Sequence, residues 1–259
     1  MTYQPDALDR RDPALIERVL PAMNAFSSSY LRLRSEGVEN VPQGPAMFAG
    51  NHNGGILGPD LFCTLPTLWR ALTVKSPLYA LAHDFAMRQV TPIGRVLQRL
   101  GAVAASRANA RRVLAAGGQV LVYPGGDLDA YRAFEHRNRV VILPRTGFVE
   151  VAKAEGVPIV PVVTRGAHRS AFIFCEGRGI ARALDMPRWA RLERFPLALA
   201  LPWGFAPGPW LPYLPLPFPV RLRVLPAIHV TKEDDTREVA RHVEKEMQRA
   251  MDDLGGRSR

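Results

Sequence analysis

The chain has 259 residues, of which 47% are apolar, so it can bury one substantial core and is not intrinsically disordered. Its formal net charge of +10 favours an anionic partner, namely nucleic acid, an acidic membrane surface or a phosphorylated substrate. The N-terminus is too polar for an expected signal peptide, and the sequence holds no uninterrupted apolar run of about 18 residues, so a membrane-spanning helix is not expected. Cys63 and Cys175 match neither a metal-ligand spacing nor a disulfide framework, which favours a reducing cytoplasm.

The predicted elements alternate between helices and strands. Asp12-Pro13 is typical of a helix start, and the helix is expected to run towards Tyr30 with a kink at Pro21. Apolar runs then predict strands at 46–50, 78–81, 119–123 and 158–163. Helical patterns lie at 59–71, 85–100, 108–116, 146–155 and 234–254. This alternation predicts the α/β class, with a central, mostly parallel sheet flanked by helices.

A proline-rich segment at 196–226 stands apart, with nine prolines among Trp, Leu and Phe. Proline at this density is expected to prevent long helices and central strands. Just upstream, 178–194 carries five arginines and only two acids, Asp185 and Glu193. Two interpretations are equally open: an irregular core segment beside a solvated helix, or a surface that places aromatic rings in lipid and arginines at headgroup phosphates.

The stretch 49–60, AGNHNGGILGPD, interrupts an apolar run with a histidine, a glycine pair and an aspartate. One interpretation is a structural histidine in a glycine-rich turn. The other is a general base, His52, whose partner is Asp60. If Pro59 starts a helix, Asp60 lies in its first turn and can point back across the loop to His52.

Three further blocks follow in order: GAVAASR at 101–107, VYPGGD at 122–127 and VPIVPV at 157–162. Together with the first, they resemble the glycerolipid acyltransferase superfamily over roughly residues 32–230. The motifs of that family are Asn-His followed after four residues by Asp, a block ending Gly…Arg, Phe-Pro-Glu-Gly-Thr-Arg, and Val-Pro-Ile-x-Pro-Val. Four blocks in order make a fairly specific signal, although each alone is weak.

The sequence departs from the family pattern at two motifs. Seven residues instead of four separate His52 from Asp60. The third block reads Tyr-Pro-Gly-Gly, and Leu128 stands where the family has its arginine. The Pro-Gly-Gly form is similar to the branch that includes diacylglycerol acyltransferases, which esterify neutral alcohols. Either Arg107 or Arg132 can compensate for the absent arginine.

The resemblance implies a division of labour among these residues. His52 is the general base that takes a proton from the attacking hydroxyl, and Asp60 fixes its tautomer. Backbone N–H groups of the glycine pairs are candidates for the oxyanion site. The substrate-binding candidates are Asn51, Gly54, Gly55, Arg107, Pro124, Gly125, Gly126 and Arg132. Neither a metal nor a cofactor is expected, and acyl-CoA or acyl-carrier protein is the co-substrate.

Other titratable residues fit a structural role better. His83 and Asp84 are adjacent, so we interpret them as structural or peripheral. His136 lies in a charged loop, and His168 and His229 lie near strand ends without a paired carboxylate. For Arg107, the alternative to anion binding is that it is one of several solvated surface arginines.

The resemblance therefore implies an acyltransferase domain at 32–230, between an N-terminal amphipathic helix at 1–31 and a C-terminal helix and tail at 231–259. The expected function is transfer of a fatty acyl group to a hydroxyl of a glycerolipid or related lipid alcohol. The protein would work peripherally or monotopically on the cytoplasmic side of an anionic membrane. The alternative is a non-catalytic lipid-binding protein on the same fold. No nucleic-acid module appears, and no G-x-S-x-G elbow supports a serine hydrolase.

Overall fold

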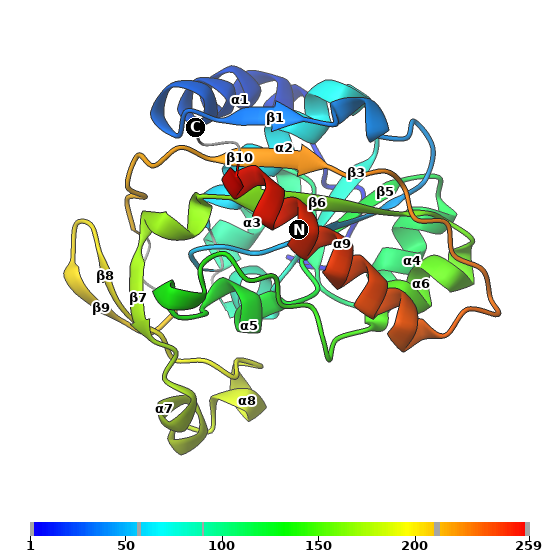
Figure 1. Ribbon diagram of the computed structural model, residues 1–259. Helices are drawn as coiled ribbons and strands as arrows, with labels where there is room; N and C mark the ends of the chain where they lie inside the picture. Colours follow the sequence, from blue (N-terminus) through cyan, green and yellow to red (C-terminus); the bar gives the residue numbers. More distant parts are fainter. Residues whose placement is uncertain (1–2, 56–57, 90, 210–212, 257–259) are drawn as a thin grey trace.

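The structure is a computed structural model, and it describes residues 3–55, 58–89, 91–209 and 213–256. A seven-stranded sheet forms the centre, with strand order β1-β10-β6-β2-β5-β3-β4 (Figure 1). Its strands are β1 (Arg34–Glu36), β2 (Met47–Gly50), β3 (Leu78–Ala82), β4 (Ala102–Ala104), β5 (Gln119–Val122), β6 (Ile159–Arg165) and β10 (Arg221–Val224). The five strands from β6 to β4 are parallel to their neighbours, whereas β10 is antiparallel to β6. The prediction of an α/β fold with a mostly parallel sheet is confirmed.

Helices cover both faces of this sheet. The described helices of four residues or more are α1 (Pro13–Ala25), α2 (Pro59–Leu72), α3 (Thr91–Arg99), α4 (Arg107–Ala115), α5 (Gly126–Ala130), α6 (Gly147–Glu155), α7 (Arg178–Ala183), α8 (Met186–Trp189) and α9 (Thr236–Gly256), with π-helical turns η1 (Phe26–Tyr30) and η3 (Phe85–Gln89) and a 3₁₀ turn η5 (Ala167–Ser170). Shorter 3₁₀ turns lie at η2 (Val38–Asn40) and η4 (Phe134–His136).

The core divides into two layers because successive strand side chains point to opposite faces. Met47 and Ala49 of β2 pack with α4, α6 and α9, whereas Phe48 packs with α1 and α2. A strand buried on both faces reads as a continuous apolar run, which is why the sequence indicated these strands clearly. Parallel strands also bring their carboxyl ends to one edge, and β2 and β5 end there in polar, glycine-containing loops.

The proline-rich segment is the main departure from expectation. It contributes β8 (Leu197–Ala200) and β9 (Gly204–Pro207), and then β10, which lies inside the large sheet between β1 and β6. The prediction that this segment holds no central strand is therefore wrong. The physical reason is local: residues 221–224 contain no proline, so each can donate a ladder hydrogen bond. Trp210 lies outside the described residues.

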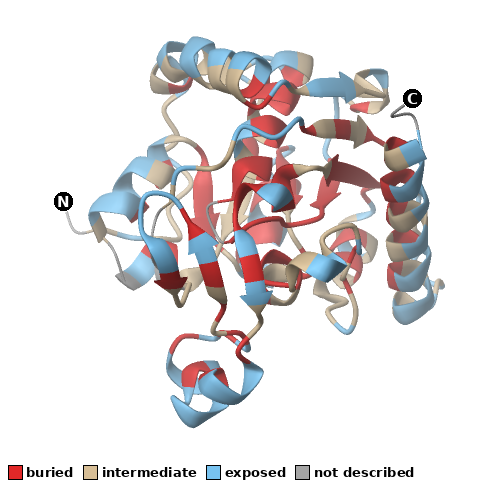
Figure 2. Cartoon of the chain, turned by 60° about the vertical axis from the view of Figure 1, so that its left-hand side comes forward, coloured by how far each residue is buried: buried red, intermediate tan, exposed pale blue. Residues whose placement is uncertain are grey.

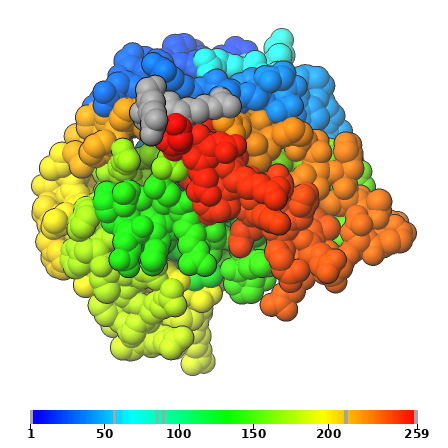
Figure 3. Space-filling model, viewed as in Figure 1, coloured from blue at the N-terminus to red at the C-terminus, as the bar shows by residue number. Residues whose placement is uncertain are grey.

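A second, three-stranded sheet has the order β7-β8-β9, with β7 at Phe172–Cys175. It lies beside the main sheet, and α7 and α8 continue from it as a projection at the bottom of the molecule (Figure 1 and Figure 3). Among the described residues, no helix is both long and apolar enough to cross a membrane.

Candidate active site

The candidate site lies at the carboxyl ends of β2 and β5. His52 follows β2 by two residues, and Asp60 lies in the first turn of α2, which begins at Pro59 as predicted. The Nδ1 atom of His52 is 2.8 Å from Oδ2 of Asp60. Both residues are buried, with His52 7% exposed and Asp60 fully enclosed. The longer spacing between them is absorbed by the loop, and the structure brings the two side chains together.

This contact selects one tautomer of the imidazole. An ionised carboxylate only accepts hydrogen bonds, so Nδ1 of a neutral His52 carries the proton and Nε2 keeps its lone pair. A histidine held in this way can accept a proton at Nε2.

The imidazole of His52 stacks on Tyr123, the residue that follows β5. The ring centroids are 4.6 Å apart and the planes differ by 28°. Gly50 makes room for this arrangement, because a Cβ atom at that position would lie 2.6 Å from Cε1 of Tyr123. The sequence analysis did not identify Tyr123 or Gly50 as part of the site. The stack restrains rotation of the imidazole.

A buried ion pair between Asp129 and Arg132 contacts the backbone of the loop that carries His52. The backbone N–H of His52 donates to Oδ2 of Asp129 at 2.5 Å, and Nη1 of Arg132 lies 2.7 Å from Oδ1 of the same carboxylate. Arg132 also donates to the carbonyl oxygen of His52 at 2.8 Å and to Oδ1 of Asn53 at 2.5 Å. Burial raises the pKa of Asp129 to about 6, although the charge of Arg132 opposes this shift. The pair fixes the backbone on which His52 is mounted.

The prediction that Arg132 binds substrate is contradicted. Its side chain is 2% exposed, and its donors are used by protein carbonyl and carboxylate oxygens. Nothing in the local sequence distinguishes a buried arginine from an exposed one. The aspartate three residues earlier is a signal that is visible afterwards, since the i, i+3 spacing places the two side chains together in a helical turn.

Asn51, Gly54 and Gly55 also have structural roles. The amide of Asn51 bonds the backbone of Thr164 twice, donating to the carbonyl at 3.0 Å and accepting from the N–H at 2.7 Å. The N–H of Gly54 donates to Nδ1 of His168 at 3.1 Å, and the N–H of Gly55 donates to the carbonyl of Ala130 at 3.1 Å. Because both N–H groups are engaged, the expectation that this glycine pair supplies oxyanion donors is contradicted.

His168 also contacts the loop that carries His52, through Gly54. Its Nδ1 accepts from Gly54, so Nε2 carries the proton and donates to the carbonyl of Arg132 at 2.8 Å. Burial and the neighbouring charge of Arg132 keep the pKa of His168 well below its usual range. The ring therefore stays neutral, which both bonds require. The absence of a paired carboxylate had hidden this role in the sequence.

The second glycine pair forms the turn between β5 and α5. Pro124 and Gly126 line the cavity described below. The N–H of Gly126 donates to the carbonyl of Tyr123 at 3.0 Å, and the carbonyl of Gly125 accepts from Nη1 of Arg145 at 3.0 Å. Arg145 lies so close to Gly126 that a side chain there would collide with its guanidinium. This close approach explains a glycine at position 126, which also has a positive φ of 51°.

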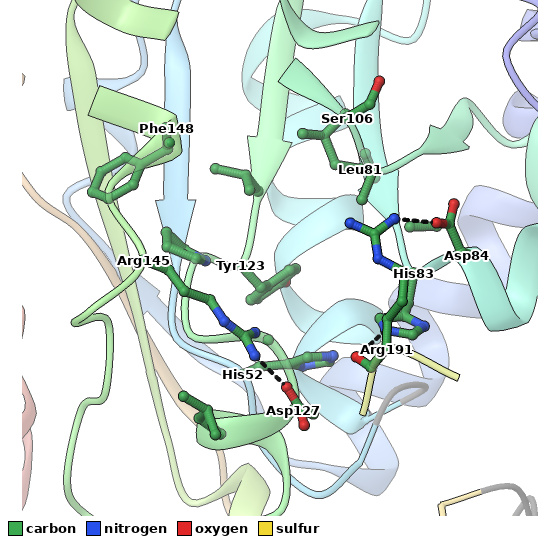
Figure 4. A pocket seen from close by; sticks show the side chains of 18 of the residues that line it. His52, Leu81, His83, Asp84, Ser106, Tyr123, Asp127, Arg145, Phe148 and Arg191 are labelled. Carbon is green, nitrogen blue, oxygen red and sulfur yellow. Dashed lines mark hydrogen bonds and ion pairs between the residues drawn. The ribbon is translucent and has the colours of Figure 1, made fainter. Parts of the chain in front are cut away.

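His52 and Tyr123 line a cavity of about 970 Å³, at the upper end of the range for small-molecule sites (Figure 4). One part of its wall is apolar and rich in small side chains, with Met47, Ala80, Leu81, Ala102, Ala110, Val122, Phe148 and Val151. His83 and Asp84, which the sequence suggested to be structural or peripheral, are part of the lining as well. The cavity thus extends from the histidine between the sheet and helices α4 and α6.

Arginines line another part of the same cavity, namely Arg107, Arg145, Arg178, Arg182, Arg191 and Arg194. Arg107 lies in this lining, is 65% exposed and is 2.7 Å from Oε2 of Glu150, so it retains one acidic partner. Arg145 pairs with Asp127 at 2.6 Å, and Arg191 pairs with Asp84 (Figure 4). Such a wall can bind phosphate groups. Among the described residues, no cluster of three or more His, Cys, Asp or Glu side chains could hold a metal ion.

A family model described as Acyltransferase matches residues 32–165, which is more than half of the chain. The chain belongs to the acyltransferase family. Its sequence is 30% identical over 192 residues to the uncharacterized protein Rv0502 of Mycobacterium tuberculosis, and 28% identical over 192 residues to the uncharacterized protein ML2427 of Mycobacterium leprae. These alignments cover 74% of this chain, and 52% and 51% of the two relatives. The chain thus spans about half the length of the curated relatives it matches.

The fold is also that of a solved acyltransferase. The crystal structure of the 1-acyl-sn-glycerophosphate (LPA) acyltransferase PlsC from Thermotoga maritima superposes with a TM-score of 0.55 at 18% sequence identity. The superposition covers 94% of this chain and 82% of that protein. At this identity the likeness shows the fold alone.

Proposed function

We propose that this acyltransferase moves a fatty acyl group from acyl-CoA or acyl-carrier protein to the hydroxyl of a glycerolipid or related lipid alcohol. The observation that carries the proposal is the 2.8 Å contact between His52 and Asp60 in the lining of a cavity large enough for an acyl chain. A module that only binds lipid has no need for a buried, carboxylate-oriented imidazole at that place.

In the proposed mechanism the acceptor hydroxyl donates its proton to Nε2 of His52 as its oxygen attacks the thioester carbonyl. Asp60 stabilises the imidazolium through Nδ1. The tetrahedral intermediate then collapses: the C–S bond breaks, the ester forms, and the departing sulfur takes the proton back from His52. The chain needs no covalent nucleophile for this sequence, and burial raises the pKa of the nearby thiol of Cys63, which keeps it unreactive.

The two parts of the cavity wall suggest where each substrate binds. The apolar wall, which includes Phe148, suits the fatty acyl chain. The arginine wall suits phosphates of the donor or of the acceptor. The Thermotoga maritima protein is named for a phosphorylated acceptor, whereas the Pro-Gly-Gly turn is similar to the branch that esterifies neutral alcohols. We propose that the protein works as a peripheral or monotopic protein on the cytoplasmic side of a membrane, where such acceptors reside.

The experiment is an acyl-transfer assay with purified protein, labelled acyl-CoA and labelled acyl-carrier protein as donors in turn, and a panel of lysophospholipids, diacylglycerol and long-chain alcohols. His52→Ala is expected to lower kcat by about 10²–10⁴-fold, and Asp60→Asn by at least about 100-fold, because each removes a part of the general base. His136→Ala, which changes an exposed histidine outside the cavity, is the matched control and should retain full activity.

Two outcomes would refute the mechanism. His52→Ala with nearly wild-type turnover would show that another group takes the proton. If the wild-type protein binds these lipids but transfers no acyl group to any acceptor, the alternative of a non-catalytic lipid-binding protein on the same fold is correct.

A further inference from the structure

The small sheet exposes large apolar side chains on its outer face. Register places Phe172 of β7 opposite Leu199 of β8, and Leu199 opposite Phe205 of β9, so these three form one row across the sheet. They are 43%, 50% and 55% exposed. Phe174, 47% exposed, stacks on Phe205 with 6.3 Å between the ring centroids. Leu201, at the end of β8, is 46% exposed. We call these five residues the outer face.

The inner face of the same sheet carries smaller side chains. Ile173 pairs with Ala198, and Ala198 pairs with Ala206, in the row next to the exposed one. These residues are 3%, 8% and 6% exposed, and the first two pack on Ala130 and Tyr131. Figure 2 shows the resulting alternation of buried and exposed residues along the strands. In water, larger apolar residues are expected on the buried side of a half-exposed sheet, so this arrangement indicates that the outer face is covered by another apolar phase.

An arginine-bearing projection links this sheet to the cavity lining. The projection formed by α7 and α8 follows directly from β7, and its Arg182 and Arg188 are exposed. It also exposes Leu184 and Trp189, at 50% and 52%. Residues of the same projection line the arginine wall of the cavity. The apolar sheet is therefore continuous in the chain with a positively charged projection whose arginines line the cavity.

We propose that the outer face and the α7–α8 projection form the docking surface of this protein for an anionic lipid bilayer. The apolar side chains enter the interface, and the arginines meet headgroup phosphates. A bilayer fits better than a second copy of this chain, because a second copy in a two-fold contact would bring its own arginines against these. The inference rests on the proposed function in one respect: a lipid acceptor then reaches the cavity without leaving the membrane.

The test is co-sedimentation with vesicles of phosphatidylcholine alone or with 30 mol% phosphatidylglycerol, without any acyl donor. The apolar variant is Phe174→Ser, Leu199→Ser and Phe205→Ser, all outside the cavity lining. Because each side chain is about half exposed, each contributes a factor of about 4–12 to partitioning, so the triple variant should bind at least about 60-fold less tightly. Val96→Ser on α3, 55% exposed and outside the docking surface, is the matched control and should bind like the wild type.

The charge variant is Arg182→Glu with Arg188→Glu. Each arginine contributes a factor of about 5 at an anionic surface, so reversing two should weaken binding at least about 25-fold to the anionic vesicles and little to the neutral ones. High salt should reproduce this loss, because the Debye length falls from about 8 Å at physiological ionic strength to about 3 Å at 1 M salt. The attraction between arginines and headgroups is then screened over a shorter distance. Arg237→Glu with Arg241→Glu on α9 is the charge-matched control, and circular dichroism with thermal unfolding verifies that each variant is folded. Phe174→Ser alone, a milder change expected to lower binding about 4–12-fold, replaces the triple variant if that variant unfolds.

The results separate this proposal from the proposed function. His52→Ala should bind vesicles like the wild type. A wild-type protein that transfers acyl groups to a detergent-dispersed acceptor but binds no vesicles would overturn the docking surface and leave the function intact. A protein that binds through these residues but is inactive would do the reverse. If wild-type protein dimerises and the triple variant is monomeric while neither binds vesicles, the outer face is a protein interface and the proposal is wrong.

Discussion

Replacing Arg132 by methionine is expected to destabilise the protein in a manner that depends on pH. The substitution leaves Asp129, which is 1% exposed, without its cationic partner and removes the donor to the carbonyl of His52. Breaking a buried ion pair by removing one partner costs about 3–5 kcal/mol. Against a total stability of about 5–15 kcal/mol, this loss should be large at neutral and alkaline pH.

The pH dependence follows from the pKa of Asp129. In the wild type, burial raises this pKa from 3.8 to about 6, so the folded state binds the proton more tightly than the unfolded state. The contribution of Asp129 to stability therefore falls as pH rises from about 4 to about 6. Without Arg132, the folded pKa rises further, and the fall continues above pH 6 at about 1.4 kcal/mol per pH unit. The cost of Arg132→Met should thus increase as pH rises above 6, by up to about 3 kcal/mol at pH 8.

The assay is urea unfolding of wild type and variant at pH 5, 6, 7 and 8, with the difference in unfolding free energy plotted against pH. Asp129→Asn combined with Arg132→Met removes the titrating carboxyl and should remove the slope. Arg139→Met, which changes an exposed arginine of the same loop, should cost little at any pH. A loss of stability for Arg132→Met that is the same from pH 5 to pH 8 would refute the assignment of Asp129 as the carboxylate that Arg132 compensates.

Two further predictions concern the cavity. Gly50→Ala places a methyl group 2.6 Å from the ring of Tyr123 and should displace the stack on His52, lowering kcat on the order of 10–100-fold, whereas Gly44→Ala, with open space around it, should have no effect on initial rates. Arg107→Ala should raise KM at least about tenfold for whichever substrate carries the bound phosphate and little for the other, because a charge-assisted contact contributes about 1.5–3 kcal/mol. Arg111→Ala, which removes an exposed arginine paired with Glu155 outside the cavity, is its control, and equal small effects on both substrates would assign Arg107 to the solvated surface.

The buried strands and the amphipathic helices could be predicted because their signals are local. The strands predicted at 78–81 and 119–123 appear as β3 and β5, and the helix predicted at 108–116 appears as α4. The small sheet could not be predicted in the same way. Its strands alternate large exposed and small buried apolar residues, so hydrophobicity alone indicates neither face, and prolines obscure their limits. β10 was missed because its partners, Glu36 and Arg165 among them, are far away in the sequence.

The candidate site shows the same division. The pairing of His52 with Asp60 could be predicted, because a helix starting at Pro59 determines where Asp60 points. Asp129 could not, because its partners include the backbone of His52, and their approach is set by the packing of β2 against β5. The N–H group of Gly54 likewise looks free in the local motif but is engaged by His168 in the folded chain.

The altered third motif illustrates how one part of a site can be supplied from another part of the chain. The resemblance implies an arginine at position 128, which carries leucine, and the sequence offered Arg107 and Arg132 as replacements. The structure indicates a third residue, Arg145, whose guanidinium bonds the carbonyl of Gly125 and the carboxylate of Asp127. A Cβ atom at position 126 would require this guanidinium to shift from its present place. Arg145 therefore packs against the glycine turn and bonds to it. The positive charge at this turn comes from a residue 17 positions beyond Leu128 in the sequence.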